Sequence, residues 1–338
     1  MKKLSVFPLL LALLLAGCGK SEARSPSYLP DDSRRLVVYT SHKEEVYRPI
    51  IREFEQRTGI WVEVVTGGTN ELLQRIDAEK DAPAADVMFG GGVESLQSRA
   101  DCFEPYRCSE SDSLLAQFCS GDHCWTPFSA LPVVLIYNTK LVSPDRITGW
   151  SDLDRREFRG KIAFADPNIS GSSFTALVTR VRVGGGDEKK VLPQFAQALD
   201  GQQLSGSGDV LTAVADGSAL VGVTLEETAL KRIAAGDNIA LVYPADGTSC
   251  VPDGSALVKG APHPDNAKAF LDFTVSRDVQ RLLEDSFCRR AVRRDIPADA
   301  ERTPLSQIPL IVYDVAWASA NRDTLLSDWA FYQKEGGK

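Results

Sequence analysis

The sequence has 338 residues, 7 cysteines and a formal net charge of −8 at pH 7. An acidic chain without a clustered basic stripe argues against nucleic acid as a partner. Its length exceeds what one hydrophobic core normally carries and therefore predicts two domains.

The N-terminus has the pattern of an export signal. Lys2 and Lys3 precede a short apolar run that ends in Leu15-Ala16-Gly17-Cys18. The run is shorter than the roughly 20 residues that span a bilayer, so a transmembrane anchor fits it less well. The pattern predicts a signal peptide over 1–17 and a lipid on Cys18, which would hold the chain at the outer face of the cytoplasmic membrane; ordinary secretion is the alternative. Residues 18–33 are small and polar and predict a tether.

The remaining cysteines are Cys102, Cys108, Cys119, Cys124, Cys250 and Cys288. An even number in an exported chain favours disulfides. Four of them flank His123, so a structural zinc site is the alternative, although their spacing lacks the paired C-x-x-C pattern. Nested pairs, Cys102 with Cys124 and Cys108 with Cys119, would leave Cys250 to pair with Cys288, and the sequence does not decide the connectivity.

The folded part begins with alternating strands and helices. Runs of β-branched residues predict strands, and apolar residues spaced three or four apart predict helices. In chain order these are a strand at 36–39, a helix at 43–57, a strand at 61–65, a helix around 72–76 and a strand at 86–89. This order predicts a parallel sheet.

The apolar segment 131–137 is interpreted as a crossover strand into a second α/β domain. That domain has predicted strands at 161–165, 220–223 and 239–243, and predicted helices at 174–181, 191–198, 210–215 and 225–235. A strand at 255–258 and a helix at 264–274 would return the chain to the first domain. The predicted domains are therefore 34–130 plus 250–338, and 131–249.

Glycine and hydroxyl residues follow the predicted strands or open the predicted helices. In parallel sheets ligands bind at the carboxyl ends of the strands, where glycine lets a ligand approach the backbone. The candidate binding residues of this kind are Thr40, Ser41, Gly68, Thr69, Gly91, Gly92, Ser170, Ser172 and Ser173. The turn at 170–173 opens a helix, where free N–H groups favour an anion. Helix capping is the alternative for these serines.

His42 and Glu226 complete the candidate set. His42 ends the first strand, where it could donate a hydrogen bond to an oxyanion or ligate a metal. Glu226 opens a helix, where the helix dipole alone explains a carboxylate, but it could also bind hydroxyls or an ammonium group. There is no G-x-S-x-G elbow, P-loop or zinc-enzyme motif, so we expect neither catalytic residues, a resident metal nor a cofactor.

Several segments together resemble the ferric-binding branch of the solute-binding proteins of ABC importers. They are Val38-Tyr39-Thr40-Ser41-His42, Phe54-Glu55-Gln56-Arg57-Thr58-Gly59, Ala85-Asp86-Val87-Met88-Phe89, Leu135-Ile136-Tyr137-Asn138-Thr139 and Asn266-Ala267-Lys268-Ala269-Phe270-Leu271. The resemblance implies an α/β fold of the two-domain periplasmic-binding-protein type II, with two mostly parallel sheets and a ligand cleft between them. It also implies a monomer that delivers a small solute to an ABC permease and its ATPase.

The branch includes binders of iron, thiamine, polyamines, phosphonates and hexose phosphates. Its iron-binding members use a histidine that His42 matches, an acidic residue after the third strand, and two adjacent tyrosines. Gly90-Gly91-Gly92 and Leu225-Glu226-Glu227-Thr228 occupy the last two positions here. Because Fe³⁺ prefers anionic oxygen ligands, the resemblance implies a phosphorylated or phosphonate solute, with ferric iron as the alternative. A sensory surface protein without a transport role is a further alternative.

Overall fold

The computed structural model describes residues 31–336. The predicted signal peptide, the predicted lipid site at Cys18 and most of the predicted tether lie outside these residues. No helix within 31–336 is both long enough and apolar enough to cross a membrane.

Three parallel strands form the first half of the sheet. The elements are β1 (Arg35–Thr40), α1 (Glu44–Thr58), β2 (Trp61–Thr66), α2 (Thr69–Ala78) and β3 (Val87–Gly92). The strand order is β2-β1-β3. Ile50 and Phe54 of α1 are fully buried in one cluster with Leu36 of β1, which is the packing that the helical spacing of apolar residues predicts. The predicted β-α-β-α-β order is confirmed.

Two long strands, β5 (Thr126–Asn138) and β9 (Cys250–Val258), join the two halves. They pair with each other in antiparallel fashion, and β9 also pairs with β3. The second part of β5, from Val133 onward, pairs with β7 (Val221–Leu225) and β8 (Ile239–Val242). Every residue of β5 is buried, which explains the continuous apolar run in its sequence.

The result is one sheet of ten strands with the order β2-β1-β3-β9-β5-β7-β6. The edge strand β6 (Ile162–Ala163) is parallel to β7, and two short strands, β4 (Phe103–Glu104) and β10 (Arg290–Ala291), pair with β9 and β5. The prediction of parallel pairing holds for β2-β1-β3 and for β6-β7. The strands that pass between the halves add antiparallel pairs.

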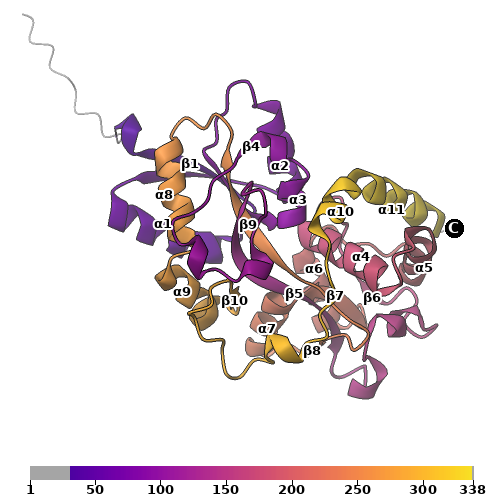
Figure 1. Cartoon of the computed structure of the whole chain (residues 1–338). Helices are drawn as coiled ribbons and strands as arrows, with labels where there is room; N and C mark the ends of the chain where they lie inside the picture. The colour runs from indigo at the N-terminus through magenta and orange to yellow at the C-terminus, as the bar shows by residue number, and fades with distance from the viewer. Residues whose placement is uncertain (1–30, 337–338) are drawn as a thin grey trace, which may run out of the picture.

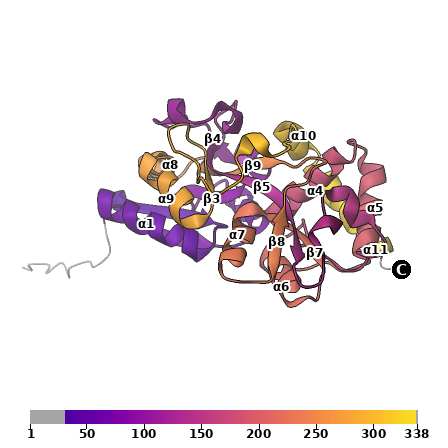
Figure 2. The same cartoon turned by 90° about the horizontal axis from the view of Figure 1, so that it is seen from below.

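Helices cover both halves of the sheet. The further helices are α3 (Val93–Gln97), α4 (Gly171–Val183), α5 (Glu188–Leu199), α6 (Ser207–Asp216), α7 (Glu226–Ala234), α8 (Pro264–Thr274), α9 (Arg277–Phe287), α10 (Val315–Ala320) and α11 (Arg322–Gly336). Both views show α1, α8 and α9 at one end of the molecule and α4, α5 and α11 at the other (Figures 1 and 2).

The C-terminal helix packs on the second half. Trp329 of α11 is fully buried, and its ring lies 5.7 Å from that of Phe164 and 5.6 Å from that of Phe195. The predicted domain boundaries assign all of 250–338 to the first half. The structure departs from this assignment at α11, because its tryptophan is part of the aromatic core beside β6 and α5.

Candidate functional site

A cavity of about 280 Å³ lies between the two halves. Its wall comes from the loop after β1, the end of β3, the starts of α1, α2, α4, α6 and α7, and the first half of β9. The wall residues used below are Ser41, His42, Lys43, Glu45, Gly68, Thr69, Gly91, Gly92, Ser170, Ser172, Glu227, Lys231, Asp253 and Arg289. A volume just below the range of drug-sized pockets suits a small metabolite.

Three helices of ten or more residues begin at the cavity wall. Gly68 precedes α2, Ser170 precedes α4 and Gly206 precedes α6, and all three residues line the cavity. The N–H groups of a first helical turn have no partner within the helix, and the helix dipole adds positive potential there. Ser172 adds a hydroxyl, whose Oγ lies 3.0 Å from Ser170 Oγ. Together these groups form a wall that favours an anion.

The end of β3 requires glycine. Gly90 and Gly91 have φ angles of 104° and 100°, which side-chain-bearing residues rarely adopt. A Cβ atom on Gly91 would also lie 2.6 Å from Thr69 Cγ2. Glycine at position 91 therefore lets the backbone of β3 pass close to Thr69 at the start of α2.

A second part of the wall consists of charged side chains that pair with one another. Arg289 donates from Nη1 to Asp253 Oδ2 at 2.6 Å and from Nη2 to Glu227 Oε1 at 3.2 Å. Lys231 Nζ lies 3.2 Å from Glu227 Oε2 and 3.0 Å from Glu45 Oε1. The bond to Lys231 lowers the pKa of Glu45. All three carboxylates are thus compensated by cations of the protein itself.

His42 lies beside this charged group and against two aromatic rings. Its ring centroid is 4.5 Å from that of Phe89 and 5.1 Å from that of Phe128. Its Nε2 is buried, lies 3.8 Å from Asp253 Oδ2 and makes no hydrogen bond. Burial, followed by the positive charge of Arg289, lowers the pKa of His42 well below 6.5. The ring is therefore neutral at pH 7.

Most of the predicted binding residues meet in the cavity wall. These are Ser41, His42, Gly68, Thr69, Gly91, Gly92, Ser170 and Ser172. They come from both halves of the sheet, and contact with a solute remains a prediction for each of them.

Thr40, Ser173 and Glu226 are predicted binding residues that do not line the cavity. Thr40 Oγ1 donates to the Phe89 carbonyl at 2.7 Å, between the neighbouring strands β1 and β3. The N–H of Ser173 donates to the capping Ser170 Oγ at 3.3 Å, and the Ser173 side chain is buried in the first turn of α4. Glu226 is 1% exposed and pairs with Arg290. The structure therefore places these three residues outside the cavity wall: Thr40 and Glu226 use their side chains in bonds within the protein, and Ser173 is buried in α4.

Several cavity residues are absent from the predicted set. Lys43 and Glu45 lie one and three residues after His42, so the rule that selects the end of β1 could have included them. No comparable signal in the local sequence marks Arg289, Asp253 or Lys231. Asp253 lies inside a buried strand, and Arg289 reaches it only after α9 and β10 have packed against β5.

The six cysteines of the described residues are all free, so the predicted disulfides are absent from the structure. The thiols instead face polar neighbours. Cys102 Sγ lies 3.8 Å from Asp77 Oδ1, Cys108 Sγ lies 3.4 Å from Ser111 Oγ, and Cys119 Sγ lies 3.5 Å from the Leu115 carbonyl oxygen.

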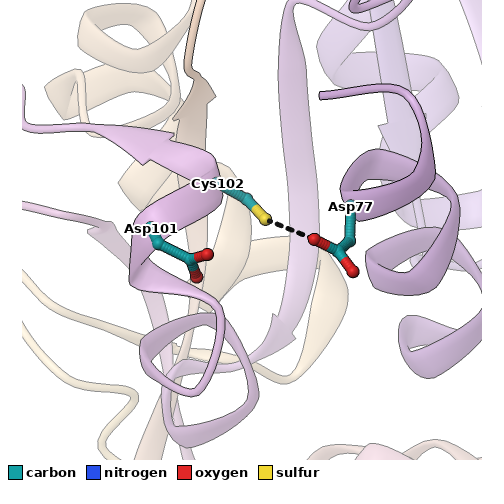
Figure 3. A group of neighbouring side chains, drawn as sticks. All are labelled: Asp77, Asp101 and Cys102. Atoms are coloured by element: carbon teal, nitrogen blue, oxygen red, sulfur yellow. Dashed lines mark hydrogen bonds between the residues drawn. The ribbon is translucent and has the colours of Figure 1, made fainter. Parts of the chain in front are cut away.

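The zinc alternative is not met either, because the four cysteines around His123 do not converge. Within residues 31–336, the one set of three possible metal ligands that meet is Asp77, Asp101 and Cys102. Figure 3 shows the Cys102 thiol directed at Asp77 of α2. Both carboxylates are exposed, and none of the three residues lines the cavity. This group is therefore separate from the candidate site.

Known proteins resemble this chain over nearly its whole length. An uncharacterized protein of Haemophilus influenzae is 27% identical over 347 aligned positions, which cover 96% of each chain. Iron uptake protein A1 of Synechocystis sp. is 24% identical, with 84% of this chain and 83% of that protein covered.

The structure of the periplasmic binding protein AfuA from Actinobacillus pleuropneumoniae, with exogenous fructose-6-phosphate bound, superposes with a TM-score of 0.82 at 24% identity. The match covers 89% of this chain and 98% of AfuA, and it shows that the fold is that of the type II periplasmic binding proteins. The family of bacterial extracellular solute-binding proteins matches residues 36–289. The chain therefore belongs to this family and is a solute-binding protein of ABC importers.

Proposed function

We propose that this protein captures a small phosphorylated or phosphonate solute outside the cytoplasmic membrane, to which Cys18 anchors it through a lipid. The single observation that carries the anionic solute is the convergence of three helix starts, those of α2, α4 and α6, on one cavity. Backbone N–H groups of this kind bind phosphate oxygens without a charged side chain.

The predicted binding residues fit this proposal as a group. Gly91 and Gly92 line the cavity without side chains, and Ser170 and Ser172 provide hydroxyl groups at the start of α4. The phosphorylated sugar bound to AfuA supports the same class of solute. We propose His42, Ser41, Gly68 and Thr69 as further contacts.

Ferric iron fits the wall less well. Fe³⁺ requires several anionic oxygen ligands, and the carboxylates that line the cavity are already paired with Arg289 and Lys231. The tyrosines of the iron-binding pattern are replaced by residues that include Glu226, whose carboxylate pairs with Arg290 outside the cavity.

Thermal unfolding of the purified protein with hexose phosphates, 2-aminoethylphosphonate, inorganic phosphate, thiamine and Fe³⁺ tests the proposal. A solute present at 100 times its Kd adds about 2.7 kcal/mol to the free energy of unfolding. We expect a shift with one or more phosphate or phosphonate compounds and none with thiamine. A shift with Fe³⁺ alone would contradict the proposal. Replacement Cys18→Ser should release the protein from the membrane fraction of cells.

A further inference from the structure

We infer that Arg289 determines the specificity of the cavity: its guanidinium occupies the place of a bound cation among His42, Asp253 and Glu227, and thereby excludes metal ions and cationic solutes. The inference rests on the proposed function only in taking the cavity as the solute site. It identifies Arg289 as the residue that excludes the cations which other solute-binding proteins of this family bind.

The position of Arg289 is that of an ion held by its ligands. The guanidinium bonds to one carboxylate from β9, Asp253, and to one from α7, Glu227. Its side chain is 7% exposed, and the two carboxylates are similarly buried. Ser129 Oγ adds a third oxygen, 2.9 Å from Nη1. Two anionic oxygens and a hydroxyl thus surround one positive charge away from water.

The imidazole of His42 lies beside this group with an unpartnered nitrogen. Its buried Nε2 lies 3.8 Å from the same Asp253 oxygen that accepts from Arg289, and it has no hydrogen-bond partner. A neutral imidazole with a free ring nitrogen is a common metal ligand, and two carboxylates with one imidazole suit a divalent transition metal. With the guanidinium in place, these ligand atoms are not gathered within 4.8 Å of one another.

The charges in the wall balance without a solute. Lys43, Lys231 and Arg289 are positive, and Glu45, Glu227 and Asp253 are negative. An arriving metal ion or ammonium group would have to displace a bonded cation, whereas an anion meets the free N–H groups at the helix starts. Loss of Arg289 would leave the buried Asp253 carboxylate without its cation and Glu227 with Lys231 alone, a state that an added cation relieves.

The test compares binding of Mn²⁺ to the wild-type protein and to Arg289→Met, by electron paramagnetic resonance of free Mn²⁺. We expect the variant to gain one site that is at least tenfold tighter than any site of the wild type. Arg289→Lys keeps the positive charge and should not gain the site. Arg289→Met combined with Asp253→Asn should lose it again. A weak site at the exposed Asp77 and Asp101 would be common to all four proteins.

The inference would be overturned if a folded Arg289→Met variant gains no Mn²⁺ site. It would also be overturned if the single replacement Asp253→Asn weakens the Mn²⁺ binding of the wild-type protein. If Arg289→Met unfolds in the absence of metal, Mn²⁺ should restore its folding, as followed by circular dichroism, and failure to do so counts against the inference. Phosphate compounds play no part in these measurements. A negative solute screen would therefore reject the proposed function while leaving the role of Arg289 to be decided by Mn²⁺.

Discussion

Arg290 binds Glu226 through two parallel hydrogen bonds, from Nε to Oε2 and from Nη2 to Oε1, each 2.7 Å long. Both side chains are almost completely buried, at 3% and 1% exposure. Tyr243 also donates to Glu226, and burial together with this bond raises the pKa of Tyr243 to about 12. The pair fixes the start of α7 and thereby the position of the neighbouring Glu227 in the cavity wall.

Replacement Arg290→Met should lower the free energy of unfolding by about 3–5 kcal/mol, because it leaves the Glu226 carboxylate buried and unpaired. Urea unfolding measures this change. Adding Glu226→Gln to Arg290→Met should recover part of the loss, since the double variant buries no unpaired charge. Equal loss in the single and double variants would show that the pair is not what stabilises this region.

Ser172 should contribute a hydrogen bond to an anionic solute, and Ser173 should not. Ser172 lines the cavity, whereas Ser173 is buried in α4. Replacement Ser172→Ala should weaken binding of the solute identified in the screen by about 1.5–3 kcal/mol, the usual contribution of a bond to a charged group. Titration calorimetry compares Ser172→Ala with the adjacent control Ser173→Ala, whose affinity for the solute should stay within twofold of the wild type. Equal effects would mean that the turn acts only through the helix.

Replacement Gly91→Ala should destabilise the protein and weaken solute binding together. A residue with a side chain is strained at φ 100°, at a cost of about 1–3 kcal/mol, and the new Cβ would contact Thr69 in the cavity wall. Thermal unfolding and calorimetry follow the two effects. Gly121→Ala is the matched control, because no atom lies within 4 Å of a Cβ at that position. Full affinity of Gly91→Ala would remove this loop from the site.

The sequence predicts the local parts of the fold well. The helix predicted at 264–274 coincides with α8, because its start has proline and its apolar spacing is regular. No element is predicted after residue 274, although Ser276 caps α9, whose Val279, Leu283 and Phe287 have helical spacing. Such a signal was available in the sequence.

The candidate site likewise has one part that the local sequence predicts and one part that it does not. Its glycine and serine turns follow strands or open helices, so each can be recognised from a few neighbouring residues. The contact of Arg289 with Asp253 joins residues 36 positions apart in a buried ion pair. Nothing in either local sequence indicates the other, because their meeting depends on how β5, β9 and β10 assemble.

The pH dependence of folding should report the environment of His42. The unfolded chain takes up a proton on this residue near pH 6.5, whereas burial keeps the folded imidazole neutral to well below that pH. The unfolded state therefore binds more protons as the pH falls below 6.5. The free energy of unfolding should then decrease, by at most about 1.4 kcal/mol per pH unit for this group.

Glu94 acts in the opposite direction, because burial raises its pKa above 4.5 and the folded state takes up that proton first. Glu94 is present in both the wild type and His42→Gln, so its contribution cancels in the difference between their free energies of unfolding. Between pH 7 and 5.5 the wild type should lose stability relative to His42→Gln, as measured by urea unfolding at each pH. Parallel curves for wild type and His42→Gln would mean that His42 is protonated as readily in the folded chain as in the unfolded one, and hence that neither burial nor the charge of Arg289 opposes its protonation.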